Sequence, residues 1–147
     1  MCLCSSSLTG CFDYVRGISH IRRDSPLPNN ACIASAVKSI SGVTDYEYKL
    51  ELGVRPLTLH GIEKPNEVHR HTYRYSGLNG NFYFEVNYKG EVEYHHTYLY
   101  LDQIPPQTEI NAIRPVMLKI EEGIEENCAL PGFASGVTET CMGVKCE

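Results

Sequence analysis

The sequence predicts an α+β fold, a two-layer sandwich in which an antiparallel meander sheet of three or four strands carries two helices on one face. Three observations indicate this fold. A helical apolar pattern lies near the N-terminus, period-two segments fill the middle, and a second helical pattern follows them. A sheet with one apolar face needs cover on that face only, and each helix offers one apolar stripe. A length of 147 residues suits one domain.

The first helix is expected to begin at Asn29 or Asn30, because an asparagine side chain can accept a hydrogen bond from the first free backbone amides. The pair Ser41-Gly42 is expected to end it. Its apolar stripe consists of Cys32, Ile33, Ala36, Val37 and Ile40.

Four strands are predicted from alternating apolar and polar residues, over 46–52, 69–75, 82–88 and 92–100. The apolar face of the first consists of Tyr46, Tyr48, Leu50 and Leu52. A tight turn at Lys89-Gly90 and other short connections join the last three strands into an antiparallel meander.

A second helix is predicted from apolar residues at three- and four-residue steps. They are Ile110, Ile113, Met117, Ile120 and Ile124, and Cys128 extends the same stripe. Pro115 should kink or split this helix, because it removes one backbone donor. Near the helix end lies an acidic cluster of Glu121, Glu122, Glu125 and Glu126. It is interpreted as a solvated face or, alternatively, as a docking site for a basic partner or a site of loose divalent-cation binding.

The segment Leu8-Thr9-Gly10-Cys11 has an aliphatic residue, two small residues and a cysteine, and it resembles the processing site of bacterial lipoproteins. The resemblance implies that residues 1–10 are the remnant of a signal peptide and that Cys11 carries lipid. It further implies a lipid-anchored tether over 11–30 and a single domain over 31–147. Because Phe12 rather than aspartate follows the cysteine, the resemblance implies an outer-membrane location facing the periplasm.

The chain holds seven cysteines. Cleavage and lipidation would leave four of them, the even number that two disulfides require. If the two helices run side by side, Cys32 and Cys128 come close, so we expect a Cys32–Cys128 bridge and a small Cys141–Cys146 loop. Four cysteines allow three pairings, and sequence alone does not choose among them. Paired cysteines are typical of an oxidising compartment.

Three histidines are candidate metal ligands, because strand residues two apart lie on one face. His69 and His71 share such a face, and His96 lies two strands away. No acidic residue joins them on that face and phenylalanines intervene, so the sequence favours no metal and no other cofactor. No Gly-rich phosphate loop, nucleophilic serine motif or pair of catalytic carboxylates is present.

A net charge of −5 does not favour nucleic-acid binding. The sequence therefore predicts a non-enzymatic, membrane-anchored envelope lipoprotein that acts as a binding or accessory module for a protein partner. The alternative is a periplasmic inhibitor or immunity protein against a toxin or hydrolase, which would use the acidic helix end.

Overall fold

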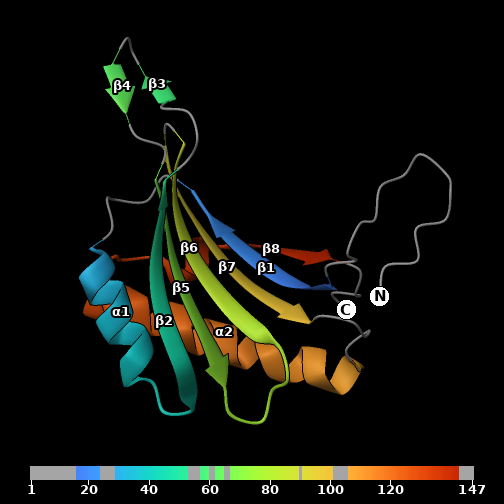
Figure 1. Cartoon of the computed structure of the whole chain (residues 1–147). Helices are drawn as coiled ribbons and strands as arrows, with labels where there is room; N and C mark the ends of the chain where they lie inside the picture. Colours follow the sequence, from blue (N-terminus) through green and yellow to red (C-terminus); the bar gives the residue numbers. More distant parts are fainter. Residues whose placement is uncertain are drawn as a thin grey trace, which may run out of the picture.

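The computed structural model describes residues 16–23, 29–52, 57–59, 62–64, 67–89, 91–100 and 106–142. These residues form an α+β fold, as predicted, with two α-helices and an antiparallel sheet of six strands (Figure 1). The elements in chain order are β1 (Arg16–Arg22), α1 (Asn30–Ser39), β2 (Val43–Leu52), β3 (Leu57–Leu59), β4 (Ile62–Lys64), β5 (Glu67–Tyr75), β6 (Asn81–Lys89), β7 (Glu91–Tyr100), α2 (Gln107–Asn127), the 3-10 helix η1 (Ala134–Gly136) and β8 (Thr138–Met142).

The strand order in the sheet is β2-β5-β6-β7-β1-β8, and every neighbouring pair is antiparallel. The predicted meander is present as β2-β5-β6-β7, and β3 and β4 form a separate two-stranded ladder between β2 and β5 in the chain. The predicted strand number of three or four is wrong, because β1 and β8 extend the sheet beyond β7.

The assignment of residues 11–30 to a tether is wrong for Arg16–Arg22, which form the inner strand β1. Ile18 and His20 lie on the helix-facing side, and Ser19 on the opposite side is also buried. Gly17 allows close pairing, because a Cβ there would lie 1.7 Å from the carbonyl oxygen of Tyr98. A strand that is buried on both faces lacks the clean alternation on which the prediction of the other strands depended.

Helix α1 begins as predicted, with the Asn29 side chain accepting from the backbone amide of Cys32. Helix α2 continues through Pro115, so the expected split does not occur. The predicted Cys32–Cys128 disulfide is confirmed, with 5.6 Å between the two Cα atoms. Cys141 is also disulfide-bonded. The predicted partner Cys146 lies outside the described residues, so the Cys141–Cys146 bond stays a prediction.

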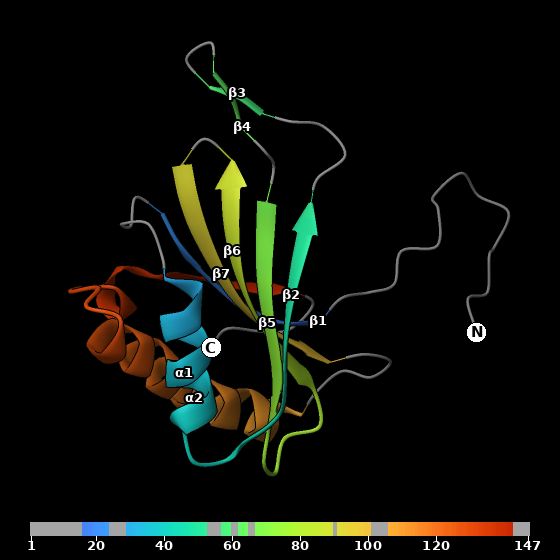
Figure 2. The same ribbon diagram turned by 60° about the vertical axis from the view of Figure 1, so that its left-hand side comes forward.

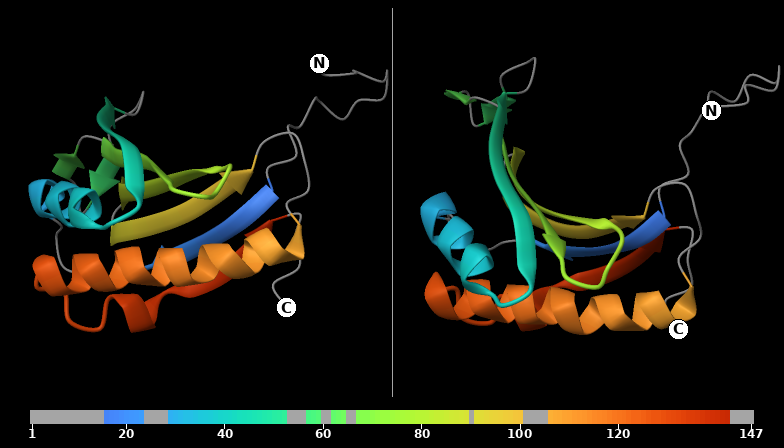
Figure 3. Two further views of the ribbon diagram at one scale, coloured as in Figure 1. Left: turned by 90° about the horizontal axis from the view of Figure 1, so that it is seen from below. Right: turned by 60° about the horizontal axis from the view of Figure 1, so that its bottom comes forward.

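Both helices pack on the concave side of the sheet, which bends around α2 (Figures 2 and 3). The core between the layers joins Ile33 and Val37 of α1 and the apolar stripe of α2 to the aromatic rings of β5, β6 and β7. Among the described helices, none has the length and apolar character that crossing a membrane requires.

Candidate functional site

One carboxylate lies inside this otherwise apolar core. Glu121 of α2 is fully buried. It follows Met117 by four residues and precedes Ile124 by three, so the helical repeat directs it to the sheet with these two apolar side chains. On the sheet it faces His20 of β1 and His96 of β7, which are direct neighbours in the β1–β7 register.

Both histidines bind the same carboxylate. The Nδ1 atom of His20 lies 2.7 and 2.8 Å from the two Glu121 oxygens, and the Nδ1 atom of His96 lies 2.9 Å from Oε2. The second nitrogen of each ring has its own partner. Nε2 of His20 lies 2.9 Å from Oε2 of Glu139 on β8, and Nε2 of His96 lies 2.5 Å from the hydroxyl of Tyr73 on β5.

The partners determine where the protons are. An ionised carboxylate only accepts hydrogen bonds, so both nitrogens of His20 donate and its ring is an imidazolium. His96 donates from Nδ1 to Glu121, and its Nε2 accepts from the hydroxyl of Tyr73. Arg114 of α2 donates to Glu139 from Nε at 3.1 Å and from Nη2 at 2.9 Å. Two cations therefore neutralise two glutamates.

The shifts in pKa agree with this assignment. Burial lowers the pKa of His20, but hydrogen bonds and charges from Glu121 and Glu139 outweigh it, so the net shift is upward. Burial raises the pKa of Glu121, and the bonds from His20 and His96 reverse this and lower it. Burial and the negative charge of Glu121 raise the pKa of Tyr73 well above its usual value, so its hydroxyl keeps its proton.

The result is a continuous hydrogen-bonded chain from buried Tyr73, through His96, Glu121 and His20, to the partly exposed pair Glu139 and Arg114. The chain joins the four strands β5, β7, β1 and β8 to α2. It also brings two imidazole nitrogens and a carboxylate oxygen within 4.8 Å of one another, which is a donor set that transition metals accept.

The other predicted histidines lie apart from this cluster. His71 is hydrogen-bonded to Tyr46 and Asn30, while Nδ1 of His69 lies 2.6 Å from the hydroxyl of Tyr48. In the sheet register Phe84 separates His71 from His96, as expected from the intervening phenylalanines. The expectation that no acidic residue joins the histidines is wrong for His96, because α2 brings Glu121 onto it. It is also wrong for His69, whose Nε2 lies 3.2 Å from Oε2 of Glu67 on the same face of β5.

The predicted acidic docking site is not one surface. Glu121 is in the core, and Glu125 accepts hydrogen bonds from the backbone amides of Gly132 and Ala134, each at 2.9 Å. Glu125 therefore holds the turn before η1. Glu122 and Glu126 are exposed, and together with the partly buried Glu125 they line a shallow hollow beside Leu118. The four glutamates are close in sequence, but their side chains leave the helix in different directions.

Sequence reasoning missed His20, Glu139 and the role of Glu121. A helical projection could have found Glu121, because its position coincides with the apolar stripe. His20 had a weaker signal, the Ile18-Ser19-His20-Ile21 stretch of strand-forming residues. Glu139 had none, because its role depends on the pairing of β8 with β1, more than a hundred residues away in sequence.

No family model matches the chain, and no curated protein or solved structure matches it either. The functional conclusion therefore depends on the chemistry of the described residues.

Proposed function

We propose that this protein is a non-enzymatic binding module that works outside the cytosol and takes up an extended segment of a partner protein along the edge of β2. One observation carries the proposal. The long edge strand β2 exposes three large apolar side chains, with Tyr48 43%, Leu50 48% and Leu52 69% exposed. In the described part of the chain, β5 alone pairs with β2 (Figure 2).

The exposed residues continue the apolar face of the sheet past the reach of the helices. Helix α1 covers the beginning of this face, where Asn30 binds His71 and Lys38 lies over the ring of Tyr46. Further along β2, Leu50 is paired with His69 and Leu52 with Glu67. These positions lie on the concave face, so a strand added beside β2 would place alternate side chains against them.

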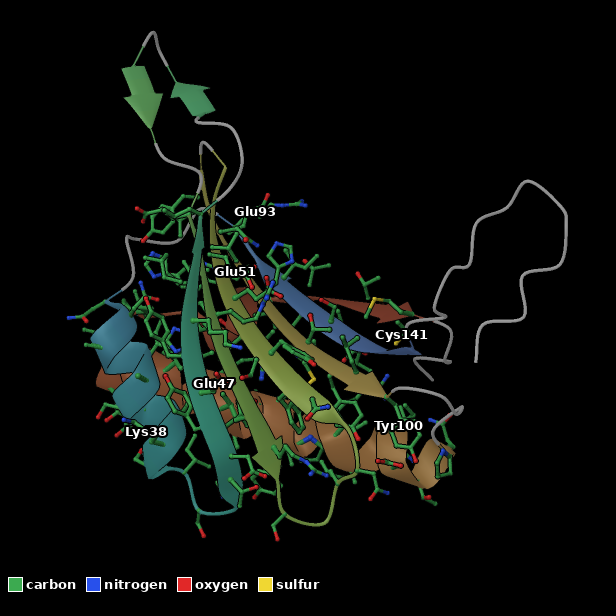
Figure 4. All side chains as sticks on the ribbon, viewed as in Figure 1. Lys38, Glu47, Glu51, Glu93, Tyr100 and Cys141 are labelled. Atoms are coloured by element: carbon green, nitrogen blue, oxygen red, sulfur yellow. A yellow bond between two sulfur atoms is a disulfide. The ribbon has the colours of Figure 1, made fainter. Side chains whose placement is uncertain are left out.

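The opposite face of β2 is charged. Glu47 forms an ion pair with Lys49, and Glu51 forms an ion pair with Arg70 at 2.6 Å. Figure 4 shows Glu47 and Glu51 along this edge strand. A bulge between Thr44 and Glu47 interrupts the register, which leaves 47–52 as the regular stretch. We infer a ligand of about six extended residues with apolar side chains on one face and polar side chains on the other.

Free edges of this kind are normally protected by charge, proline or a covering segment, because an unpaired strand recruits other chains. Backbone hydrogen bonds would supply affinity, while the row of Tyr48, Leu50 and Leu52 would supply selectivity. The Cys32–Cys128 disulfide supports work in an oxidising compartment.

We further propose the envelope location that the lipoprotein resemblance implies, with lipid on Cys11. Since β1 begins at Arg16, the folded domain would start within about 18 Å of the anchor. Growth of cells that express the full-length gene with a radioactive fatty acid tests this proposal. Label is expected on the wild-type protein and not on Cys11→Ser, and unlabelled wild-type protein would refute the anchor.

The edge proposal is tested by selecting displayed random decapeptides on the purified full chain. Alternating apolar peptides are expected, with binding lost in Leu50→Lys and kept in Leu118→Lys, whose leucine on α2 is similarly exposed at 46%. Methylating backbone nitrogens of a selected peptide should abolish binding at alternate positions only, because one edge of a strand faces β2.

Two results would contradict the edge proposal. Equal loss of binding in Leu50→Lys and Leu118→Lys would place the site elsewhere. Analytical ultracentrifugation that shows a dimer, broken by Leu50→Lys, would mean that a second copy of this chain occupies the edge.

A further inference from the structure

We propose that His20, His96 and Glu121 form a binding site for one Zn²⁺ ion between α2 and the sheet. The three residues belong to β1, β7 and α2 and do not include the β2 edge. Its basis is the convergence of the two Nδ1 atoms on a single carboxylate from two neighbouring strands and a helix. Each of the three residues is at most 8% exposed.

The ligand types select the class of metal. Two imidazoles and one carboxylate suit Zn²⁺ and related transition metals, whereas Ca²⁺ and Mg²⁺ prefer sites made of oxygen atoms. The four-coordinate geometry of zinc would leave one position beyond these three side chains. Cys32, Cys128 and Cys141 are all disulfide-bonded, so none of them supplies a thiolate.

The surroundings resemble the outer shell of a metal site. A ligating histidine usually has its second ring nitrogen held by a carboxylate or another polar group, which sets the ring orientation. His20 has Glu139 in this position, at 2.9 Å, and His96 has the hydroxyl of Tyr73. Glu139 is itself held by Arg114. Both rings are therefore oriented with Nδ1 toward the common centre.

Metal binding would require the three ligand atoms to move. Tetrahedral Zn²⁺ with bonds of about 2.05 Å separates its ligand atoms by about 3.3 Å. The contacts from Nδ1 to the carboxylate, now 2.7 to 2.9 Å, would open slightly, and the widest ligand pair, at most 4.8 Å apart, would close. Glu139 and Arg114, each with 30% of the side chain exposed, lie at the outer end of the cluster and offer the entry route.

Both histidines change their protonation when the metal binds. The Nδ1 atom of each histidine must present a lone pair to the metal. His20 would then release its Nδ1 proton to solvent and keep its Nε2 proton for Glu139. His96 would move its proton from Nδ1 to Nε2, and the Tyr73 hydroxyl would turn from donating to this nitrogen to accepting from it. Glu121 and Glu139 supply two negative charges beside the cation.

Equilibrium dialysis of the tag-free, oxidised full chain against Zn²⁺, followed by metal analysis, tests the proposal. One Zn²⁺ per chain is expected. Zn²⁺ binding should weaken at least about 100-fold in His96→Gln, which removes a ligand. It should weaken about 10- to 100-fold in Glu139→Gln, because Glu139 contacts the ligand His20 but not the metal. The matched controls His69→Gln and His95→Gln keep the same histidine count as His96→Gln and should bind as the wild type does.

A second measurement removes dependence on variant folding. Co²⁺ added to the wild-type chain is expected to show the intense visible absorption of a four-coordinate site, displaced by one equivalent of Zn²⁺. Less than 0.1 Zn²⁺ per chain at 100 times the protein concentration would overturn the proposal, as would an equal loss in the two controls. In either case the cluster is only a hydrogen-bonded network.

Discussion

Acid should destabilise this protein through His71, a buried neutral histidine on β5. Its side chain is inaccessible to solvent and lies between the Tyr46 hydroxyl, 2.8 Å from Nδ1, and the side-chain amide oxygen of Asn30, 3.1 Å from Nε2. The amide oxygen can only accept, so Nε2 carries the proton and Nδ1 accepts from tyrosine. Burial, and secondarily the charge of His69, lowers the pKa of His71 from 6.5 to about 4.

The sign of the effect follows from proton counting. Between the folded pKa of about 4 and the unfolded value of 6.5, the unfolded chain binds more protons at this site, so stability falls as pH falls. At about 1.4 kcal/mol per pH unit, the contribution lost between pH 7 and pH 4 is about 3 kcal/mol. That is a large fraction of the stability of a small domain.

Urea unfolding followed by circular dichroism at pH 7, 6, 5 and 4 measures this contribution. The free energy of unfolding of the wild type should fall about 3 kcal/mol more than that of His71→Gln over this range. Acidic groups common to both proteins cancel in the comparison. His95→Gln, which changes a partly exposed histidine, should follow the wild type. Parallel curves for wild type and His71→Gln would refute the reasoning.

Three further predictions concern stability, and denaturant unfolding checks each. Glu121→Ala should lower the free energy of unfolding by about 3 to 5 kcal/mol, because it leaves the imidazolium of His20 buried with one partner fewer, while Glu122→Ala should change it by less than about 0.5 kcal/mol. Replacing both Cys32 and Cys128 by serine should cost about 4 to 5 kcal/mol, because the bond closes a loop with a sequence separation of 96; an unchanged midpoint would contradict that bond. Gly17→Ala should prevent cooperative folding, because the added Cβ overlaps the Tyr98 carbonyl, whereas Gly77→Ala, in a turn with open space, should cost only about 1 kcal/mol for its positive φ.

The meander could be predicted because its strands have one buried face, so residues such as Phe82, Phe84 and Val86 alternate with polar neighbours. The Cys32–Cys128 bond could be predicted because the apolar stripes of both helices had to cover the same face of the sheet. Strand β1 could not be found in this way, since Ile18 and Ile21 lie on opposite faces and both Ser19 and His20 are buried.

The candidate site was predicted only in part. His96 was recognised, but its carboxylate partner comes from a helix whose glutamates looked alike in sequence. Burial of Glu121 is offset by His20 and His96, two groups that lie 101 and 25 residues away. Such compensation depends on tertiary contacts, which local periodicity does not report.

The position of β1 has a consequence for how the chain acquires its structure. Its partners β7 and β8 begin 75 and 122 residues after it, so neither edge of the first strand can be satisfied early in synthesis. Long-range pairing of this kind slows folding, because distant ends must meet before their contacts stabilise anything. A chain that stops before Thr138 would leave the outer edge of β1 open to aggregation. We therefore expect this domain to complete its sheet only after β8 has been synthesised.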